Sequence, residues 1–384
     1  MSLKIGTALA LSGSLVAFAA MAQDASEQST TPQFGISAEM SDYVRDKYIF
    51  VFSDRMKKKN VAAEARRMAR RMGAEIVHVY DTAIRGFAAR MPAAVAAKMA
   101  KDPMIDYYEP DGVAFVTMNR SGGEFTAQAQ TTPWGITRVG GPGDGTNLGL
   151  YAFVIDTGID LDHPDLNVAT SLSRSFVTGL SSPDDQNGHG THVAGTIAAK
   201  NDGNGVVGVA AGARVVSVRV LNAQGSGSFS DIIAGVNYVA QVGLAGEVAN
   251  MSLGGPRSTT LDNAVRNAAA RGIFFSIAAG NSSVSATTTS PARVNATNVY
   301  TVSAMDINDE LASFSNFGNP PIDCADPGVN ILSTWPGGGT ATLSGTSMAA
   351  PHLAGILLLN NGRAFNGGTV SWDRDSTPDT ICVR

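Results

Sequence analysis

The chain has 384 residues, of which 44% are hydrophobic, 16% are charged and 42 are glycines. This composition is typical of a compact, loop-rich globular protein and excludes an intrinsically disordered chain. Beyond the N-terminal segment there is no apolar run of 18 residues, which argues against a membrane-spanning helix in the mature protein. The length allows more than one folded unit.

Charge is unevenly spread along the chain, although it sums to only −5. Residues 41–120 carry 15 Lys and Arg against 10 Asp and Glu, whereas residues 121–384 carry 12 against 20. This asymmetry has two interpretations: two solvated surfaces of different isoelectric point, or a basic segment that docks on an acidic domain. The acidic C-terminal part offers no electrostatic footprint for nucleic acid.

The first 44 residues predict a leader followed by a linker. Lys4 precedes a largely apolar stretch from Ile5 to Ala19, and Ala20-Met21-Ala22 has the small-x-small pattern of a cleavage site. Residues 1–22 are therefore predicted to be a secretory signal peptide, since their apolar run is too short to span a membrane comfortably. Residues 23–44 are rich in Ser, Thr, Gln and Pro and are expected to be a linker.

Residues 45–117 have the pattern of a small α+β unit. A helix rich in Ala and Arg is expected from Val61 to Met72, ended by Gly73, and Pro92 is placed to open a second helix. Strand character is found at residues 48–52, 76–80 and 86–91, and residues 102–111 close the unit. The small, polar residues 118–128 are expected to form a cleavable connector.

Residues 129–384 alternate between strand and helix patterns. Strands are predicted at residues 151–155, 214–220, 247–251 and 273–278, and helices at residues 189–199, 228–242, 259–271 and 346–360. Apolar strands separated by helices predict a parallel sheet covered on both faces. In such sheets the functional site lies beyond the carboxyl ends of the strands. Asp156, Ser252 and Asn281 each fall at or just after the end of a predicted strand.

Three motifs present Asp, His and Ser, in that order, among small residues. They are Asp156-Thr157-Gly158, the segment from Asn187 to Gly195 around His189, and the segment from Gly345 to His352 around Ser347. A hydrolytic triad needs a nucleophile, a base that takes its proton and a carboxylate that holds the base in one tautomer. Small neighbours allow a substrate backbone to approach all three side chains.

Each motif taken alone has a simpler interpretation. Asp-Thr-Gly also occurs in aspartic proteases, but those need a second such segment and the chain has none. Ser347 could be an ordinary helix N-cap. His192 follows His189 at the His-x-x-His spacing of zinc sites, although no further ligand lies nearby in the sequence.

Together with the Ala-Ala-Gly-Asn segment that ends at Asn281, these motifs resemble those of the subtilisin-like serine proteases, the subtilases, over residues 130–359. The order Asp, His, Ser is that of subtilisin itself. The resemblance implies that Asp156 is the orienting acid, His189 the general base and Ser347 the nucleophile. It also implies that Asn281 donates a side-chain hydrogen bond to the oxyanion.

The resemblance further implies the family's domain organisation. The expected fold is a three-layer α/β sandwich with a mainly parallel central sheet, preceded by a small α+β pro-domain. Residues 45–117 would be the inhibitory pro-domain, which in this family assists folding and then blocks the active site. Residues 129–384 would be the catalytic domain, and the mature chain would start near Ala129.

Two glycine-rich segments resemble the walls of the family's substrate cleft. They are Ser252-Leu253-Gly254 and Gly225-Ser226-Gly227, along which a peptide could lie as an added strand. An ordinary strand-end turn explains Gly225–Gly227 almost as well. Residues 281–290 are mostly Ser, Thr and Ala without charge, which predicts a preference for apolar or aromatic residues before the scissile bond.

The resemblance also implies structural calcium. A strong site would use side chains and carbonyl oxygens of Gln130, Asp165, Lys200, Asp202, Asn204 and Val206, since hard oxygen ligands with two carboxylates suit Ca²⁺. A metal-free turn rich in Asn, Asp and Gly is the alternative. A second site would combine Asp323 with the carbonyls of Thr297 and Val299.

Cys324 and Cys382 are the two cysteines of the sequence. After export they could form a disulfide that closes a long loop, or remain two buried thiols. The tail after Leu359 is shorter than the usual subtilase end, so the sequence leaves open whether the family's last helix is present.

The function predicted from the sequence is that of a secreted serine endopeptidase made as a zymogen. Its partners would be protein or peptide substrates and its own pro-domain, and it would act as a monomer without nucleic acid or membrane. A catalytically silent peptide-binding protein of the same fold is one alternative, and an esterase with the same mechanism is another.

Overall fold

The structure, a computed structural model, describes residues 36–116, 119–120, 125–126 and 129–384. The predicted signal peptide lies outside these residues, as does most of the predicted connector. None of the helices within the described ranges combines the length and the apolar character that crossing a bilayer requires.

A short helix, α1 (Ala38–Val44), lies inside the segment that was expected to be a linker. Ser37 caps it, because its hydroxyl accepts a hydrogen bond from the backbone N–H of Met40 at 3.2 Å. Met40 is buried although it belongs to this polar segment. The structure differs from the expectation here because serine is common in linkers but also caps helices.

The next unit is an antiparallel sheet with two helices on one face. The strand order is β2-β3-β1-β4, and Phe50 of β1 stacks on Phe87 of β3 with ring centroids 5.1 Å apart. Gly73 ends the first helix in the left-handed conformation, with φ of 66°. The elements are β1 (Lys47–Phe52), a 3₁₀ turn (Lys58–Asn60), α2 (Val61–Met72), β2 (Glu75–Tyr80), β3 (Gly86–Arg90), α3 (Ala93–Met99) and β4 (Ile105–Pro110).

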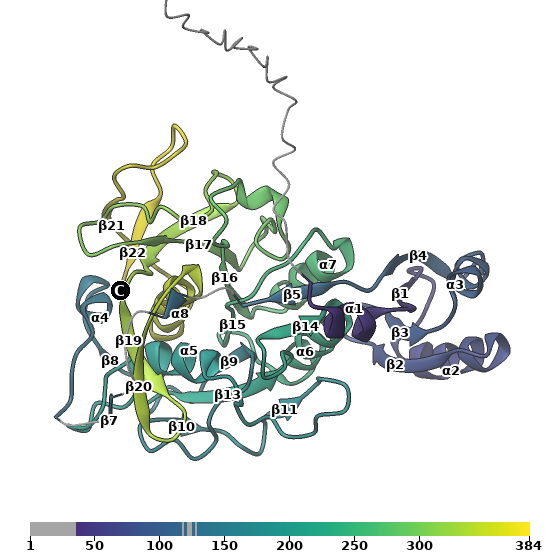
Figure 1. Ribbon diagram of the computed structural model, residues 1–384, viewed down its shortest axis with the longest axis horizontal. Helices are drawn as coiled ribbons and strands as arrows, with labels where there is room; N and C mark the ends of the chain where they lie inside the picture. The colour runs from purple at the N-terminus through teal and green to yellow at the C-terminus, as the bar shows by residue number, and fades with distance from the viewer. Residues whose placement is uncertain (1–35, 117–118, 121–124, 127–128) are drawn as a thin grey trace, which may run out of the picture. The chain divides into compact units, whose positions relative to one another are not determined.

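The large sheet of the C-terminal unit has the order β10-β13-β9-β15-β16-β17-β18-β22-β21, with β11 also paired to β13 (Figure 1). All its pairs are parallel except β21 with β22. Its strands are β9 (Tyr151–Asp156), β10 (Asn167–Val168), β11 (Arg174–Ser175), β13 (Arg214–Arg219), β15 (Val248–Met251), β16 (Phe274–Ala278), β17 (Val299–Met305), β18 (Ile322–Pro327), β21 (Phe365–Thr369) and β22 (Thr380–Val383).

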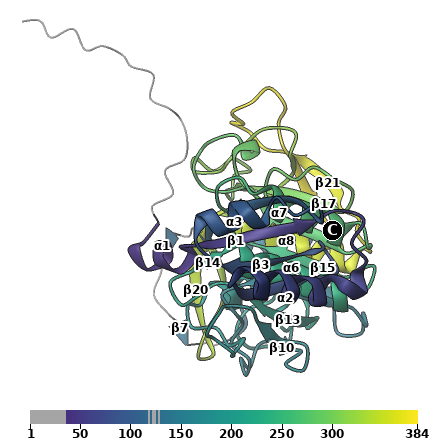
Figure 2. The ribbon, with the colours of Figure 1, turned by 90° about the vertical axis from the view of Figure 1, so that its right-hand side faces the viewer.

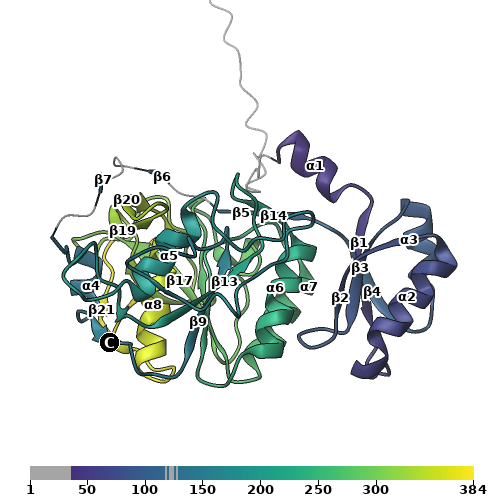
Figure 3. The ribbon, with the colours of Figure 1, turned by 90° about the horizontal axis from the view of Figure 1, so that it is seen from below.

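Helices cover this sheet on both faces, which confirms the predicted three-layer α/β fold. Helices α5 (His189–Ala198) and α8 (Thr346–Leu359) pack on one face in one apolar core. Helices α6 (Phe229–Val242) and α7 (Thr259–Ala269) pack on the other face in a second core (Figure 3).

Smaller elements surround the sheet (Figure 2). Two short pairs, β8 with β12 and β5 with β14, and a sheet in which β20 pairs with β19, β6 and β7 complete the described fold. These elements are β5 (Val113–Phe115), β6 (Asn119–Arg120), β7 (Phe125–Thr126), α4 (Trp134–Arg138), β8 (Gly143–Asp144), β12 (Ala210–Ala211), β14 (Ser226–Ser228), a 3₁₀ turn (Ala286–Thr288), β19 (Ile331–Trp335) and β20 (Gly339–Ser344).

The C-terminal tail is a hairpin. After α8 the described chain forms β21 and β22 and no further helix. Cys324 of β18 and Cys382 of β22 form a disulfide between neighbouring strands, 58 residues apart in sequence. The tail is therefore held to the sheet by strand pairing and by a covalent bond, in place of a terminal helix.

Candidate active site

The candidate site lies at the carboxyl end of the parallel sheet. Asp156 is the last residue of β9, and Ser252 directly follows β15. His189 is the first residue of α5, and Ser347 is the second residue of α8. Because β9 and β15 are parallel neighbours, their carboxyl ends meet at one edge, and helices on the same face can begin beside them.

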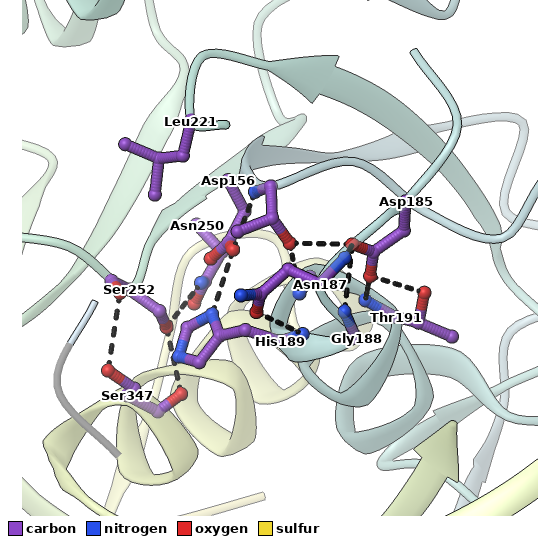
Figure 4. A network of polar contacts seen from close by, with 12 residues as sticks. Asp156, Asp185, Asn187, Gly188, His189, Thr191, Leu221, Asn250, Ser252 and Ser347 are labelled. Atoms are coloured by element: carbon purple, nitrogen blue, oxygen red, sulfur yellow. Dashed lines mark hydrogen bonds and ion pairs between the residues drawn. The ribbon is translucent and has the colours of Figure 1, made fainter. Parts of the chain in front are cut away.

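Asp156 and His189 form a buried pair. Their side chains are both fully buried, and His189 Nδ1 lies 2.8 Å from Asp156 Oδ1. The same carboxylate oxygen accepts the backbone N–H of Thr157 at 2.7 Å. Among the described residues His189 Nε2 has no hydrogen-bond partner, and the ring lies between Asp156 and Ser347 (Figure 4). The carboxylate therefore fixes one ring nitrogen and leaves the other able to accept a proton.

Ser347 and Ser252 exchange two hydrogen bonds. The Ser347 hydroxyl donates to the carbonyl of Ser252 at 3.2 Å, and the Ser252 hydroxyl donates to the carbonyl of Ser347 at 2.8 Å. The second bond has a local cause. Pro351 lies four residues after Ser347 and has no N–H, so the helix itself cannot satisfy that carbonyl. Asn250 in turn donates to the Ser252 hydroxyl at 2.8 Å.

The amide of Asn281 is oriented by the start of α8. Its oxygen accepts hydrogen bonds from the backbone N–H and the hydroxyl of Thr346, at 2.9 and 2.8 Å. The Nδ2 donor of the same amide therefore points away from Thr346. Asn281 and Ser347 line the same pocket, so a developing negative charge there could meet a side-chain amide and a helix N-terminus.

Asp185 organises the loop before His189, although it was not among the residues predicted from the sequence. Its Oδ1 accepts hydrogen bonds from the Thr157 hydroxyl and from the backbone N–H groups of Asn187 and Gly188, each at 2.9 Å. Its Oδ2 accepts the N–H and hydroxyl of Thr191 (Figure 4). The loop is polar and rich in turn residues, so no sequence signal separates this carboxylate from its neighbours.

Gly188 and Gly190, on either side of His189, have no room for a larger side chain. Gly188 has φ of 107°, and a Cβ there would lie 2.4 Å from the ring of Trp335. A Cβ on Gly190 would lie 2.0 Å from the carbonyl oxygen of Gly158. These close approaches let α5 begin directly against the Asp156-Thr157-Gly158 turn.

The two predicted cleft walls flank one strand of the N-terminal unit. Strand β5 pairs antiparallel with β14, in the register Ser226 with Phe115. On the other side, Phe115 exchanges backbone hydrogen bonds with Gly254 at 2.9 and 3.1 Å. Val116 N donates to Gly225 O at 2.9 Å. The structure thus brings both glycine-rich segments together around residues 113–116.

A pocket opens beside this strand. Among the described residues no charged side chain lines it, which agrees with the uncharged composition expected for residues 281–290. Its lining consists of Phe115, Leu253, Gly254, Ala278, Ala279, Gly280, Asn281, Ser282, Thr289, Asn316, Thr346 and Ser347.

The zinc interpretation of His189 and His192 finds no support in the structure. His192 is fully buried, and its Nε2 lies 3.0 and 3.1 Å from the carbonyls of Ile331 and Ala341. Burial lowers its pKa to about 3, so it is neutral and donates to the backbone. Within the described ranges, no three His, Cys, Asp or Glu side chains are placed to hold a metal ion.

The residues of the predicted strong calcium site do come together. Gln130 Nε2 lies 2.8, 3.2 and 3.3 Å from three converging carbonyl oxygens, and the amide can turn so that its oxygen occupies that side. These carbonyls belong to Lys200, Asn204 and Val206. The set fits a hard cation, because calcium takes six to eight oxygen ligands, many of them carbonyls.

The two carboxylates of this set lie in the same place. Asp165 is buried, and its two oxygens accept backbone N–H groups of Lys200 and Val206 at 3.2 and 3.0 Å. Asp202 Oδ1 accepts the N–H of Asn204 at 3.1 Å. Asp165, Asp202 and Asn204 line one pocket.

In the second predicted calcium site, the carboxylate of Asp323 is hydrogen-bonded to the backbone. Asp323 lies where the register of β17 with β18 shifts, and its Oδ2 accepts the N–H of Thr301 at 2.9 Å. Val299 opens β17, and Thr297 lies just before it. This site stays a prediction.

Comparisons with known proteins place the two units in families. The subtilase family matches residues 149–375, and the peptidase inhibitor I9 family matches residues 47–116. M-protease of Shouchella clausii is 43% identical over 290 residues, which cover 74% of this chain and 71% of that protein. Proteinase R of Parengyodontium album is 35% identical over 359 residues, covering 89% of this chain and 86% of that protein.

A solved structure shows the same likeness. The crystal structure of a cold adapted subtilisin-like serine proteinase is 40% identical, has a TM-score of 0.58, and covers 65% of this chain and 96% of that chain. The chain therefore belongs to the subtilase family and is a subtilisin-like serine protease that carries an I9-type inhibitory pro-domain.

Proposed function

We propose that this protein is a secreted serine endopeptidase made as a zymogen, with Ser347, His189 and Asp156 as its catalytic triad. The observation that carries the proposal is the fully buried Asp156–His189 pair, joined at 2.8 Å, with Ser347 beside the open ring nitrogen. All three side chains come from motifs far apart in the sequence.

The mechanism follows from this geometry. Ser347 Oγ turns from the Ser252 carbonyl to His189 Nε2, gives up its proton there, and attacks the carbonyl carbon of the peptide bond. Asp156 stabilises the imidazolium that forms. Asn281 Nδ2 and the N-terminus of α8 stabilise the oxyanion. His189 then passes its proton to the leaving amine, and water hydrolyses the acyl-enzyme by the reverse steps.

The pro-domain, residues 45–117, would inhibit the enzyme by occupying the substrate cleft. Residues 113–116 are hydrogen-bonded to Gly254 and Gly225 as a bound peptide would be. We therefore propose Ser252, Leu253, Gly254, Gly225, Ser226 and Gly227 as substrate-binding residues. Cleavage in the segment between Val116 and Ala129 would release the mature chain.

Acidic residues of the pro-domain meet helix N-termini of the catalytic domain. Asp111 accepts the N–H and hydroxyl of Ser230, in the first turn of α6, at 3.0 and 2.6 Å. Glu109 accepts the hydroxyl of Ser258, which precedes α7, at 2.5 Å. The positive end of each helix favours these carboxylates, which supports inhibition in the uncleaved chain.

Some basic side chains of the pro-domain take part in this contact: His78 Nε2 lies 2.7 Å from Asp231 Oδ1 in α6, and the charge of Asp231 also acts on the buried Lys47. Arg67 and Arg71 pair with Glu64 and Asp102 inside the pro-domain itself. Both interpretations of the charge asymmetry therefore have support: opposite charges meet at His78 and Asp231, while other basic side chains of the pro-domain are solvated. The contact is specified by local geometry, such as the Asn237 side chain, whose oxygen accepts three consecutive backbone N–H groups of residues 81–83.

The uncharged pocket beside Ser347 supports a preference for apolar or aromatic residues before the scissile bond. A charged residue there would lose water without gaining a partner of opposite charge.

We further propose that calcium binds the Gln130, Asp165 and Asp202 set, where it would join the N-terminal segment of the mature chain to the loop of residues 200–206. We also propose export by residues 1–22 and a monomeric enzyme.

The test is labelling of the secreted protein with a serine-directed fluorophosphonate, alongside hydrolysis of casein and of a small ester. We expect the probe on Ser347, none on Ser347→Ala, and hydrolysis of both substrates. Labelling without amide hydrolysis would favour the esterase, and a secreted, processed chain without labelling would favour the silent binding protein. N-terminal sequencing of the product locates the processing bond.

A further inference from the structure

Helix α1 lies before the residues that match the I9 family, 47–116, yet it contacts the catalytic domain. It packs against β14, a strand of the proposed cleft wall (Figure 1). Met40 is 4% exposed, and Nδ2 of Asn222, in the loop before β14, lies 3.5 Å from its sulfur. Val177 and Leu180 line the same pocket as Met40. The buried methionine of this polar segment thus has its partner surface in the catalytic domain.

Tyr43 joins α1 to the catalytic domain through two hydrogen bonds. Its hydroxyl donates to Asp231 Oδ2 at 2.7 Å and accepts the backbone N–H of Thr178 at 3.0 Å. The carboxylate of Asp231 is fully buried and belongs to the first turn of α6. Burial and the charge of Asp231 raise the pKa of Tyr43, so its hydroxyl stays protonated and remains a donor. Loss of this donor would take a charge-assisted hydrogen bond from a buried carboxylate.

Two further pro-domain side chains gather at the same place. His78 Nε2, from β2, lies 2.7 Å from Asp231 Oδ1, and the Thr178 hydroxyl donates to that oxygen at 3.3 Å. Lys47 of β1 is buried, and its Nζ lies 3.6 Å from the centroid of the Tyr43 ring. An ammonium group is attracted to the face of an aromatic ring, most strongly where water is excluded. Tyr43 therefore contacts both a cation of the pro-domain and an anion of the catalytic domain.

α1 is also fixed to the I9 module. The guanidinium of Arg90, the last residue of β3, donates to the carbonyls of Tyr43 and Arg45 at 3.0 and 2.6 Å. These carbonyls lie at the C-terminal end of α1, where a helix leaves them without donors of its own. The backbone N–H of Met91 donates to the carbonyl of Asp46 at 2.8 Å. We therefore expect α1 and the I9 module to leave the catalytic domain together.

We propose that residues 37–46 extend the inhibitor beyond the I9 module, and that the Tyr43–Asp231 contact slows release of the cleaved pro-domain. The docking surface on the catalytic domain is formed by Asp231 with residues 177–180 and 222–227, and its occupant is α1 of the same chain. The inference rests on the proposed inhibition by the pro-domain. Because α1 packs on β14 while β5 pairs with that strand, the cleft wall is uncovered only when both have left. Contacts that break on dissociation act on the rate of release.

The experiment uses the full-length chain with Tyr43→Phe, which keeps the ring over Lys47 and removes only the hydroxyl. The measured quantity is the lag between processing and hydrolysis of a peptide substrate, while the cleaved pro-domain is still bound. We expect Tyr43→Phe to shorten this lag by on the order of 10-fold, because the buried carboxylate of Asp231 loses one donor. The final rate per enzyme titrated with the fluorophosphonate should be unchanged, since residue 43 lies outside the proposed mature chain.

Tyr48→Phe is the matched control, because Tyr48 packs against Tyr108 within the pro-domain, with ring centroids 6.1 Å apart. It should leave the lag unchanged. An unchanged lag in Tyr43→Phe, or an equal shortening in both variants, overturns the proposal. A chain that yields no active enzyme contradicts the proposed function instead, and hydrogen exchange then tests the inference by itself.

Amide hydrogen exchange is measured in the Ser347→Ala chain, which cannot cleave its own connector. The N–H of Thr178 has the Tyr43 hydroxyl as its acceptor, so Tyr43→Phe should speed its exchange by on the order of 10-fold. The N–H of Phe176 donates to the carbonyl of Arg219 at 2.8 Å within the catalytic domain and should exchange as before. Exchange at Thr178 as slow as in the parent chain would mean that α1 does not dock there, against the proposal.

Discussion

The helices that carry His189 and Ser347 begin differently from those that contact the pro-domain. α5 and α8 start after Gly188 and Gly345, which have no capping side chain, so side chains from other segments bond their first turns: Asp185 accepts the N–H of Thr191, and Asn281 accepts the N–H of Thr346. α6 and α7 start after Ser228 and Ser258, whose hydroxyls accept backbone N–H groups of the first turn. Glycine leaves space for side chains of other segments to reach the helix end, whereas serine stabilises its own helix end, which a neighbouring carboxylate can then approach.

The extent of burial separates α7 from the other three helices. Every residue of α5 is buried, including its second histidine, His192, and so is nearly all of α8, including His352. α7 keeps an exposed side at Thr259, Arg266 and Asn267, whereas α6 is exposed only at Gln241 near its end. α5, α8 and most of α6 therefore depend on close packing in the core, and α6 and α7 also have serine caps at the ends that face the pro-domain.

Gly188→Ala should have the largest effect on stability. The residue has φ of 107° and a Cβ would lie 2.4 Å from the Trp335 ring, so left-handed strain and overpacking add to about 2–5 kcal/mol. Urea unfolding of the Ser347→Ala chain measures the loss. Gly179→Ala is the control, because φ there is 87° but a Cβ meets nothing within 4 Å, and it should cost only about 1–2 kcal/mol. Equal losses would contradict the role of the ring.

Asn281→Ala should lower kcat by about 10²–10³-fold, or about 2.7–4 kcal/mol, which is the size of the effect when subtilisin, a relative, loses its side-chain oxyanion donor. The melting temperature should change little, because Thr346 can bond to water in the opened pocket. Kinetics on a peptide amide substrate provide the measurement. A lost affinity with an unchanged kcat would show that Asn281 only positions the substrate.

His352 in α8 should make the catalytic domain sensitive to acid. Burial lowers its pKa from 6.5 to about 4, so between these values the unfolded chain binds one more proton than the folded chain. Stability then falls as pH falls, by about 1.4 kcal/mol per pH unit for this residue. In Ser347→Ala chains unfolded with urea at pH 4.5, 5.5 and 6.5, His352→Gln should remove that share of the slope. Parallel slopes for the two chains would refute it.

Asp111→Ala should weaken pro-domain docking by about 1–3 kcal/mol, because two donors of Ser230 lose their acceptor. We expect the processed complex to become active sooner after cleavage, measured as the lag before peptide hydrolysis. Asp106→Ala is the control, since Asp106 is exposed on the neighbouring strand β4. If both variants shorten the lag equally, docking depends on net charge and not on the end of α6.

Several features of the fold could be predicted because they depend on local patterns. The strand expected at residues 151–155 is β9 (Tyr151–Asp156), and the helix expected at 259–271 is α7 (Thr259–Ala269). The first is a short apolar run and the second has apolar residues at helical spacing, so hydrophobic periodicity predicts both. α1 was missed, because a Ser-rich segment predicts a linker unless a partner surface for Met40 is known.

The sequence by itself determined which residues to propose as catalytic, because Asp, His and Ser stand in three motifs of small residues in the order of a known triad. Only the tertiary structure decided the partners of these residues. The Ser347 hydroxyl points to the Ser252 carbonyl, Asp185 braces the loop before His189, and the tail ends in a disulfide-linked hairpin. The physical reason is that hydrogen bonds and burial join residues distant in sequence, and local patterns carry no record of such distant neighbours.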